Sequence, residues 1–331
     1  MKKSNVSIFV THKGCKNLCS FCDQKSISGS ITPANRDDVV KAVQTAIQSG
    51  CSSDSEIAFF GGSFTAIDKD YMLSLLSAAY PFLKSGSFSG IRVSTRPDEI
   101  DAERLRILKD YGVTAIELGA QSMDDEVLRK NRRGHTAKDV EDASLLIKEF
   151  GFSLGLQMMT GLYGSTDETD RKTFNKILSL NPDTVRIYPT VTLEGTYLET
   201  LLNEGKYIPP TLEQTVELCS EFLMQLEKTD ITLLRLGLHS TESMNSKRVA
   251  GPYHEAFGQL CRSRVMLKKA LPLLDKKGIN EILIHPDSLS DMQGHKKENL
   301  VRLKDMGYSV KILTDDTLKK REIKIIKKEE E

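Results

Sequence analysis

The sequence predicts an α/β protein built on a partial (β/α)6 barrel, with a smaller C-terminal α/β extension. Over about the first two hundred residues, short apolar runs rich in β-branched residues alternate with longer segments of helical period. Such an alternation predicts parallel strands joined by right-handed helical crossovers. Six strand–helix units fit in this length, whereas a complete eight-unit barrel takes about 250 residues, so we expect an open, partial barrel.

The predicted elements follow one another in order along this part of the chain. The predicted strands are Val6–Thr11, Glu56–Phe60, Ile91–Ser94, Ala115–Leu118, Leu154–Met159 and Val185–Tyr188. The predicted helices are Arg36–Gln48, Tyr71–Leu83, Asp101–Tyr111, Ala137–Phe150 and Asp167–Leu180. In parallel α/β folds the site forms at the carboxyl ends of the strands, so we expect the functional residues in the loops that follow them.

The alternation loosens after about Gly205, and Pro209-Pro210 marks a break. We therefore expect one domain over residues 1–205 and an α/β extension over residues 206–331. The charged tail from Lys319 to Glu331 is expected to be a solvated, frayed end. The elements predicted for the extension are a helix at Leu212–Glu227, a strand at Ile231–Leu236, a turn-rich loop at His239–Tyr253, a helix at Glu255–Ala270, a strand at Glu281–His285, a helix at Lys296–Met306 and a strand at Ser309–Leu313.

Composition limits the classes of partner. The 331 residues carry 46 basic and 46 acidic side chains, which argues against an unstructured basic nucleic-acid binder but leaves a local basic groove open. No apolar run approaches the ~20 residues of a membrane span, and no signal-peptide pattern follows the first methionine. We expect a cytoplasmic protein with no membrane partner. Its isolated cysteines, Cys51, Cys219 and Cys261, are then reduced thiols.

Three further cysteines lie in the loop after the first predicted strand. Cys15, Cys19 and Cys22 are separated by three and then two residues, and thiolates this close can hold one soft metal centre. Three thiolates are one fewer than the four that close an ordinary iron–sulfur cluster, so one iron would be left open to another molecule. His12 lies just upstream, which keeps a structural zinc site of one histidine and three cysteines as an alternative.

The cysteine spacing, with Phe21 before the last cysteine, resembles the signature of radical S-adenosylmethionine (SAM) enzymes. The resemblance implies a [4Fe–4S] cluster held by Cys15, Cys19 and Cys22, with SAM chelated at the open iron. It implies that an electron from the reduced cluster breaks the S–C5′ bond of SAM, and that the resulting 5′-deoxyadenosyl radical abstracts a hydrogen atom from a substrate. It also implies a low-potential electron donor of the flavodoxin or ferredoxin type.

Motifs at the later strand ends carry the same resemblance. Gly61-Gly62-Ser63 resembles the family's Gly-Gly-Glu region, which holds the SAM methionine, with serine in place of glutamate. Ser94 and Gln157 stand where relatives often carry carboxylates, while Gln121 suits ribose hydroxyls and Arg133 suits the SAM carboxylate. The SAM-binding residues that the resemblance implies are Phe21, Gly61, Gly62, Ser63, Ser94, Gln121, Arg133 and Gln157.

The two serine positions and the segment Tyr188-Pro189-Thr190 are similar to the radical SAM core of the elongator catalytic subunit, which modifies tRNA. The sequence ends without the acetyltransferase domain of that subunit, so we expect the radical core without the complete elongator reaction. The resemblance favours an RNA substrate. The candidate substrate-pocket residues are Arg96, His135, Arg186 and Tyr188, and the residues expected to form a basic groove for RNA are Arg96, Arg132, Lys247 and Arg248.

Two alternatives from other classes stay open. One is a small-molecule radical SAM enzyme similar to the oxygen-independent coproporphyrinogen oxidase group, which apolar pocket walls without converging Lys and Arg would favour. The other is a zinc- or cluster-stabilised binding module without turnover. Fold analogy alone does not choose the substrate.

Overall fold

The computed structural model describes residues 5–11, 13–23, 32–239 and 242–328. His12, the extra ligand of the zinc alternative, lies outside these residues. By its internal contacts the chain divides into two compact units. Met1–Pro210 and Ile231–Pro252 form the first, which we call the barrel unit, and Thr211–Asp230 and Tyr253–Glu331 form the second, which we call the C-terminal unit.

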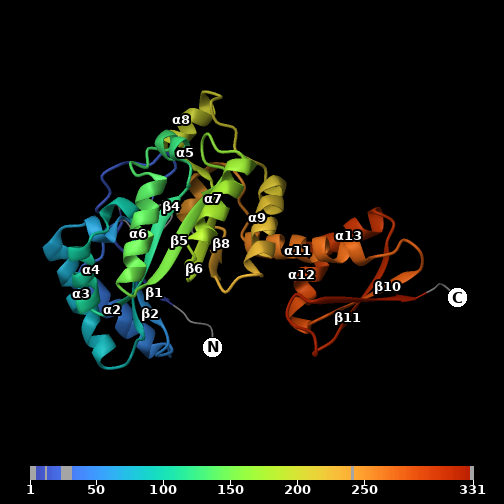
Figure 1. Cartoon of the computed structure of the whole chain (residues 1–331), viewed down its shortest axis with the longest axis horizontal. Coiled ribbons are helices and arrows are strands. Elements are labelled where there is room, and N and C mark those ends of the chain that lie inside the picture. The colour runs from blue at the N-terminus through green and yellow to red at the C-terminus, as the bar shows by residue number, and fades with distance from the viewer. Residues whose placement is uncertain (1–4, 12, 24–31, 240–241, 329–331) are drawn as a thin grey trace. The chain divides into compact units, whose positions relative to one another are not determined.

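A seven-stranded, wholly parallel sheet is the frame of the barrel unit, and it curls into a half-barrel (Figure 1). Its strand order is β1-β2-β3-β4-β5-β6-β8, so the first six strands follow chain order as expected. The partial barrel is therefore confirmed. The strands are β1 (Asn5–Phe9), β2 (Glu56–Phe60), β3 (Gly90–Thr95), β4 (Val113–Gln121), β5 (Ser153–Thr160), β6 (Thr184–Pro189) and β8 (Thr232–Leu236).

The seventh strand corrects one expectation. The run Ile231–Leu236 was assigned to the extension, but β8 pairs in parallel with β6 and extends the barrel sheet. The loop expected over His239–Tyr253 also belongs to this unit. There, α10 (Glu242–Lys247) leads to β9 (Arg248–Ala250), which pairs antiparallel with β7 (Thr192–Leu193). Local apolar period does not indicate which sheet a short strand joins, because that choice depends on pairing across the fold.

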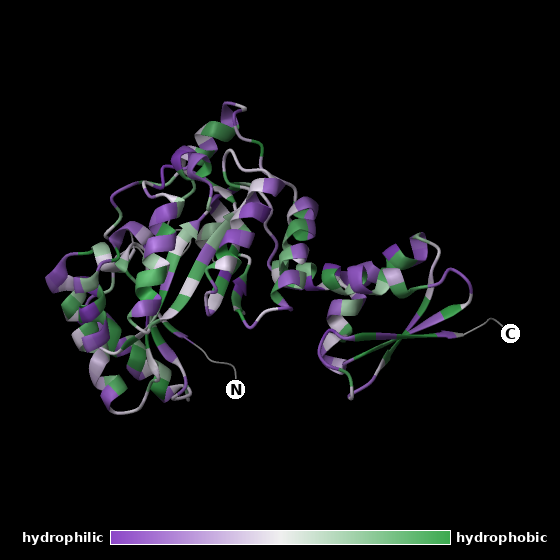
Figure 2. Cartoon of the chain, in the orientation of Figure 1, coloured by the Kyte–Doolittle hydropathy of each residue, from purple (hydrophilic) through white to green (hydrophobic). Residues whose placement is uncertain are grey.

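Capped helices cover the outer face of the sheet. Each begins at a side chain that accepts a backbone N–H, such as Asn35 before α2 and Thr136 before α6. Their apolar stripes pack on strand residues such as Phe59 and Leu118, both fully buried, and their polar faces look outward (Figure 2). The helices are α2 (Arg36–Gln48), α3 (Lys69–Lys84), α4 (Ala102–Asp110), α5 (Asp125–Lys130), α6 (Ala137–Glu149), α7 (Asp167–Ser179) and α8 (Tyr197–Asn203).

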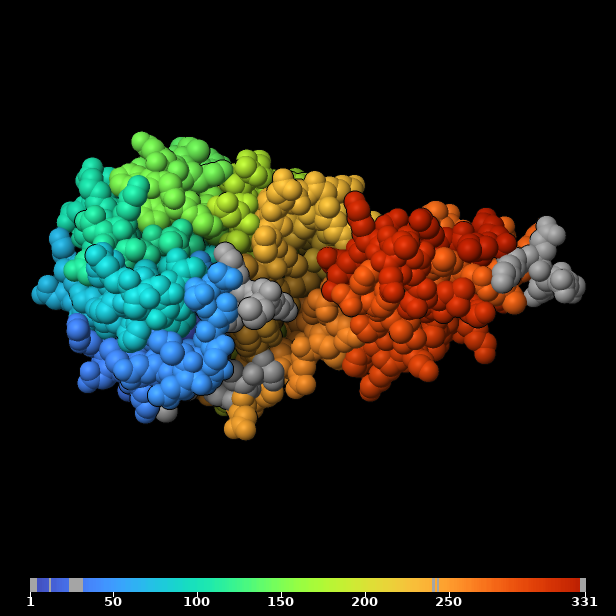
Figure 3. Space-filling model, turned by 90° about the horizontal axis from the view of Figure 1, so that it is seen from below, coloured from blue at the N-terminus to red at the C-terminus, as the bar shows by residue number. Residues whose placement is uncertain are grey.

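The C-terminal unit is an α/β layer with its own apolar core. Its sheet has the order β11-β10-β12, with β11 parallel and β12 antiparallel to β10. Apolar side chains of α11, β10 and α13, including Met266, Ile282 and Leu303, form the core. Figure 3 shows the orange and red residues of this unit as a continuous surface. Its elements are α9 (Leu212–Leu226), α11 (Phe257–Ala270), β10 (Ile279–Ile284), α12 (Leu289–Gln293), α13 (Glu298–Asp305), β11 (Ser309–Thr314) and β12 (Ile323–Lys328).

Two expectations for this unit are wrong. The tail is not frayed as far as it is described, because β12 pairs with β10 along its whole length and Ile323 packs on the core. The helix expected from Lys296 begins at Glu298 instead. Lys296 and Lys297 have φ values of 50° and 64°, which a right-handed helix does not allow. No helix in the described part of the chain is long and apolar enough to cross a bilayer.

Candidate functional site

The three loop cysteines lie together after β1. Cys19 is buried, Cys15 and Cys22 are half-buried, and the Cys22 N–H donates to the Cys19 carbonyl at 3.2 Å. Burial raises the pKa of the Cys22 thiol to about 12, and the negative charges of Cys19 and Cys15 add to this shift. A cationic iron centre would favour the thiolate form of such a buried thiol. The residues therefore fit an iron–sulfur cluster.

The spacing of the three thiols distinguishes a site for a single metal ion from a site for a cluster of several metal ions. Among the described residues, no three His, Cys, Asp or Glu side chains converge closely enough to ligate one metal ion. In a cluster each thiolate approaches its own iron, so the three sulfurs need not meet at one point. Around the cysteines lies an apolar cluster that excludes water, in which Phe21, Val127 and Leu198 are buried with Cys19.

Two glycine turns lock the cysteine loop onto the end of β2. Gly14 and Gly62 have φ values of 71° and 59°, in the left-handed region that favours glycine. A Cβ on Gly62 would lie 2.2 Å from the carbonyl oxygen of Lys13, and one on Gly14 would lie 2.3 Å from that of Ser63. The Ser63 N–H donates to the Lys13 carbonyl at 2.9 Å. The predicted Gly61-Gly62-Ser63 motif therefore touches the cysteine loop through its backbone.

The Ser63 side chain is largely engaged within the protein. It is fully buried, its hydroxyl accepts the Arg96 N–H at 3.2 Å, and it shares a hydrogen bond of 2.9 Å with the Thr95 hydroxyl. A hydroxyl has one donor and two acceptor sites, so one site remains for a ligand. Ser94, on the opposite side of its strand from Thr95, is half-buried and lies 3.5 Å from the Gln157 amide.

Three predicted residues at the end of β4 and after α5 come together with unsatisfied polar atoms. In the described structure no hydrogen-bond partner is found for the buried Gln121 Oε1, Arg133 Nε and His135 Nδ1. Arg133 donates from Nη1 to Cys19 Sγ at 3.1 Å and from Nη2 to the Gly119 carbonyl at 2.6 Å. A buried polar atom without a partner is costly, so this cluster beside the cysteines suits a polar ligand.

His135, one of the candidate substrate-pocket residues, is held against the backbone of β4. Its ring is buried, and its Nε2 lies 3.2 Å from the Ala120 carbonyl, which can only accept, so Nε2 carries the proton. Burial lowers the pKa of His135 to about 4, and the Arg133 charge adds to this shift. A histidine bonded to the β4 backbone helps to order the loop after α5, and its place in the substrate pocket stays a prediction.

Glu117 is the centre of a charged layer on the concave face of the sheet. It is 1% exposed and accepts from Arg186 Nε at 2.8 Å, Arg92 Nη1 at 3.3 Å and Gln157 Nε2 at 2.7 Å. Arg92 also donates to Glu56 at 2.8 Å. The layer thus crosses β2 to β6 and places the predicted residues Arg186 and Gln157 in one network. Tyr188 lies on β6 two residues beyond Arg186, with its pKa raised by burial.

Four charged strand residues are absent from the predicted site: Glu56, Arg92, Glu117 and Arg235. Arg235 pairs in register with Arg186. The signal was present, because Arg92, Glu117 and Arg235 are charged residues with apolar neighbours on both sides within predicted strands, where alternate positions face opposite ways. Arg235 donates to the carbonyls of Gly237 and Leu238, at 3.0 and 2.9 Å. Within the described ranges it forms no ion pair with a carboxylate.

The expected basic groove is not borne out at Arg96. Its side chain is 4% exposed and forks onto Asp98 at 2.9 and 2.8 Å, so it is not free to bind phosphate. The Asp98 carboxylate, two residues away along the chain, therefore occupies the guanidinium of Arg96. Lys247 pairs with Asp23 at 3.2 Å, and Arg248 is exposed on β9. Arg132 is exposed and lies over the Tyr197 ring, 3.4 Å from its centroid.

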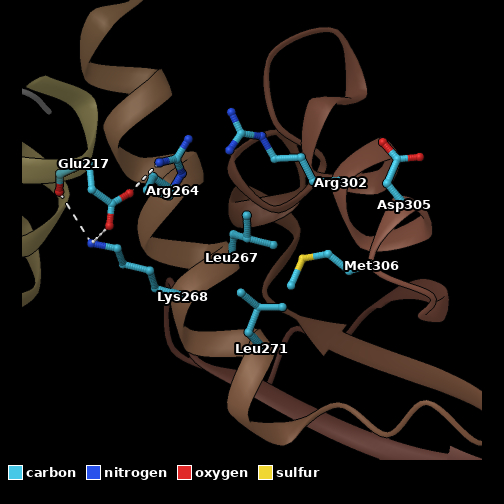
Figure 4. Close-up of a pocket in the computed structure, with 8 residues that line it drawn as sticks. All are labelled: Glu217, Arg264, Leu267, Lys268, Leu271, Arg302, Asp305 and Met306. Carbon is cyan, nitrogen blue, oxygen red and sulfur yellow. Dashed lines mark hydrogen bonds and ion pairs between the residues drawn. The ribbon is translucent and has the colours of Figure 1, made fainter. Parts of the chain in front are cut away.

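A hollow of about 400 Å³ lies elsewhere, within the C-terminal unit (Figure 4). Its cations are already paired, with Arg264 and Lys268 on Glu217 and Arg302 on Glu213. None of the predicted site residues lines it. The residues that line it are Glu217, Arg264, Leu267, Lys268, Leu271, Arg302, Asp305 and Met306.

The model of the radical SAM superfamily matches residues 9–177, and that of a radical SAM C-terminal domain matches residues 182–267. The tRNA uridine(34) acetyltransferase of Dehalococcoides mccartyi is 31% identical over 174 residues, which are 46% of this chain and 38% of that protein. The heme chaperone HemW of Bacillus subtilis is 27% identical over 240 residues, 70% of this chain and 63% of that protein.

Among solved structures, the Elp3 protein of the archaeon Methanocaldococcus infernus, with its N-terminus deleted, superposes with a TM-score of 0.65 at 22% identity. The superposition covers 81% of this chain and 63% of that one. At this identity the likeness supports the fold alone. The chain spans between about a third and two thirds of the length of these relatives, so their whole activities do not transfer with the match.

Proposed function

Because the chain belongs to the radical SAM superfamily, we propose that Cys15, Cys19 and Cys22 ligate its [4Fe–4S] cluster and that it modifies an RNA by radical chemistry. When bound, the cluster supplies the electron that splits SAM into methionine and a 5′-deoxyadenosyl radical. The observation that carries the ligand assignment is the contact between Arg133 and Cys19 beside unpartnered buried polar atoms.

The chain's own residues have three tasks in this proposal. Arg133 places a positive charge 3.1 Å from Cys19 Sγ, which stabilises the thiolate form of that ligand. The turns at Gly14 and Gly62 hold the cysteine loop against β2, so the three sulfurs keep their spacing. The apolar cluster with Phe21 and Leu198 keeps water and oxygen from the metal centre.

We assign the SAM cradle to Gly61, Gly62, Ser63, Gln121 and Arg133. The unpartnered Oε1 of Gln121 suits a ribose hydroxyl, and the unpartnered Nε of Arg133 suits the SAM carboxylate. Ser94 and Gln157 line the same face, but the Gln157 amide is already held by Glu117 at 2.7 Å. Any contact of Gln157 with ribose would then use its carbonyl oxygen.

We place the protein in the cytoplasm, where thiols and an oxygen-labile cluster stay intact.

An RNA substrate is supported by charge on the concave face and by the relatives. Arg92 and Arg186 bind the two carboxylates Glu56 and Glu117, and Arg235, in register with Arg186, adds a third cation, so this layer has an excess positive charge. An anionic group such as a phosphate would balance it. The relative from Dehalococcoides mccartyi is by its name a tRNA-modifying enzyme. The similarity to the heme chaperone HemW covers more of this chain, 70%, and favours a small molecule as the second candidate.

Anaerobic reconstitution tests the proposal. The protein should turn brown, bind about four irons and release 5′-deoxyadenosine from SAM when dithionite is added. A colourless, folded protein that holds one zinc would contradict it. To identify the substrate, RNA and metabolite fractions from cells grown in D2O are added separately. Because the radical abstracts a hydrogen atom from its substrate, we expect deuterium in the 5′-deoxyadenosine only with the RNA fraction. Label with the metabolites alone would favour the second candidate.

A further inference from the structure

We propose that the exposed surface beside the cysteine loop, formed by Lys16, Leu18, Lys130, Arg132 and Tyr197, is where an acidic one-electron carrier protein of the flavodoxin type docks. We call it the Leu18 surface. The inference rests on the proposed cluster ligands, because its partner is whatever protein reduces that cluster.

The position of Leu18 is the first observation. It lies between Cys15 and Cys19 and is 67% exposed, whereas Cys19 beside it is 8% exposed. The backbone of one exposed apolar residue is thus directly bonded to that of a buried proposed cluster ligand. An exposed leucine alone is ordinary on a protein surface. At this place it gives a partner protein an apolar contact next to the proposed metal centre.

The second observation is that the loop after α5 runs alongside the cysteine loop. The Ser20 N–H donates to the Asn131 carbonyl at 3.1 Å, and Asn17 Nδ2 lies 3.4 Å from the Arg133 carbonyl. The two segments therefore run in opposite directions, which places Leu18 and Cys19 opposite Arg132. The Ser20 carbonyl accepts the Leu198 N–H at 2.8 Å, so the start of α8 joins the same surface.

The third observation is how Arg132 is held. It is an exposed, non-glycine residue with φ of 57°, a conformation that L-amino acids rarely adopt. Its guanidinium lies 3.4 Å from the centroid of the Tyr197 ring, and Tyr197 is 37% exposed. In the described residues Arg132 forms no ion pair. A strained residue that displays an unpaired cation on an aromatic platform suggests a binding role.

The charge of the surroundings selects the partner. Lys16 is 70% exposed and pairs with the buried Glu99, while Lys130 lies over the Tyr163 ring. Arg129 and Lys130 share one exposed carboxylate, that of Glu126. The surface is therefore cationic around an apolar centre. An acidic protein satisfies both features, since its carboxylates meet the cations and its apolar residues meet Leu18. An RNA backbone would pair with the cations but not with Leu18.

The electron balance is simple. The anionic hydroquinone of the carrier gives up one electron and becomes the neutral semiquinone. That electron would reduce the cluster that Cys15, Cys19 and Cys22 would hold, and no proton or group would move between the two proteins. Docking at the Leu18 surface would bring the flavin beside the loop that carries Cys15, Cys19 and Cys22.

Two variants with matched controls test the proposal on the reconstituted holoenzyme. Leu18→Glu is compared with Leu145→Glu, because Leu145 on α6 is 64% exposed and lies outside this surface. Arg132→Glu is compared with Arg106→Glu, an exposed arginine on α4. The first readout is the Kd of a recombinant oxidised flavodoxin, measured by calorimetry at two salt concentrations. The second is the rate of SAM cleavage with reduced flavodoxin and, separately, with dithionite.

We expect Leu18→Glu and Arg132→Glu each to weaken flavodoxin binding by about tenfold or more, and the controls to leave it within about twofold. Wild-type binding should weaken as salt rises. Dithionite is small and needs no docking surface, so cleavage driven by it should be unchanged in all four variants. If dithionite fails with the wild type, the proposed function itself is wrong. If dithionite works and all four variants bind flavodoxin equally, the docking proposal is wrong. Variants that lose tRNA binding but keep flavodoxin binding would also overturn it.

Discussion

Arg133 donates a hydrogen bond from Nη1 to Sγ of Cys19, 3.1 Å away and 114 residues earlier in the chain. The same guanidinium binds the carbonyl of Gly119 at the end of β4 through Nη2. One side chain thus joins the cysteine loop after β1 to the middle of the sheet. Because a hydrogen bond and a positive charge both stabilise electron density on sulfur, this contact should affect the electronic properties of the proposed cluster.

Replacing Arg133 tests that contact. Arg133→Met keeps most of the length of the side chain but removes the charge and the donor, so we expect a more negative cluster reduction potential and weaker SAM binding. An EPR-monitored redox titration measures the first and equilibrium dialysis the second. The control is Arg129→Met, since Arg129 is exposed and pairs with the exposed Glu126. An unchanged potential in an Arg133→Met protein with a full cluster would contradict the assignment.

The cysteine ligands are tested by iron content. Cys19→Ala leaves two thiolates, which hold a four-iron cube poorly, so we expect loss of the brown colour and of SAM cleavage together. Cys51→Ala is the matched control, because Cys51 lies outside the loop and bonds to Ser55 at 3.2 Å. Its variant should keep the iron content of the wild type. Full iron content in Cys19→Ala would remove Cys19 from the ligand set.

Two glycines distinguish the cost of backbone strain from the cost of a steric clash when a Cβ is added. Gly50 and Gly62 both have positive φ, but a Cβ on Gly50 meets nothing within 4 Å, whereas one on Gly62 would lie 2.2 Å from the Lys13 carbonyl. Gly50→Ala should cost about 1–2 kcal/mol of stability from backbone strain alone. Gly62→Ala should cost about 1–3 kcal/mol more and should also lower iron uptake, because the cysteine loop must move. Denaturant unfolding of the metal-free proteins measures the costs, and equal costs would show that the loop yields freely.

The charged layer should matter for stability. Glu117→Gln leaves Arg92 and Arg186 buried without their shared carboxylate, and removing one partner of a buried ion pair costs about 3–5 kcal/mol. Glu126→Gln, at an exposed ion pair on α5, should cost less than about 1 kcal/mol. Urea unfolding of both variants checks the difference. A Glu117 variant as stable as the wild type would mean that the layer is not held by this carboxylate.

Asp170 predicts a pH dependence with a definite sign. Burial raises the pKa of Asp170 from 3.8 to about 7, so in the window between these values the folded protein holds a proton that the unfolded chain has released. Its contribution to stability is fully present below pH 3.8 and is lost as the pH rises through about 7. Asp170→Asn cannot ionise, and its amide oxygen can still accept the Gly161 N–H.

The measurement for Asp170 is Tm against pH. We expect the wild type to lose stability between pH 5 and pH 7.5 relative to Asp170→Asn, so that the variant gains most at the upper end. Glu168→Gln is the control, at an exposed first-turn residue of the same helix. Parallel Tm curves for the wild type and Asp170→Asn across this range would show that the carboxyl titrates normally.

Local sequence patterns predicted most of the strands and helices of the barrel unit. The first six predicted strands and the helices between them agree with the structure to within a few residues at their ends, because apolar period and capping residues act over one or two turns. The cysteine motif was equally local, since its three thiols lie within eight consecutive residues, Cys15 to Cys22. The match of the radical SAM model to residues 9–177 confirms the family that this motif indicated.

The contacts of single side chains were not predicted. Arg96 forks onto Asp98, and His135 bonds to the β4 backbone. Glu117 was passed over although it accepts from two arginines and a glutamine. Each of these outcomes depends on neighbours brought together by strand pairing, which no short window of sequence contains.

The chain by itself therefore determined its fold class, its family and the three thiols on which its chemistry depends, since all of these follow from patterns that repeat or cluster within a few residues. Only the tertiary structure decided which cations are free and which are already paired, and which strand completes the half-barrel. It also brought Arg133 to Cys19 and Arg132 to the surface beside Leu18. These are contacts between segments far apart in sequence, and their energies depend on distance and burial in the folded state.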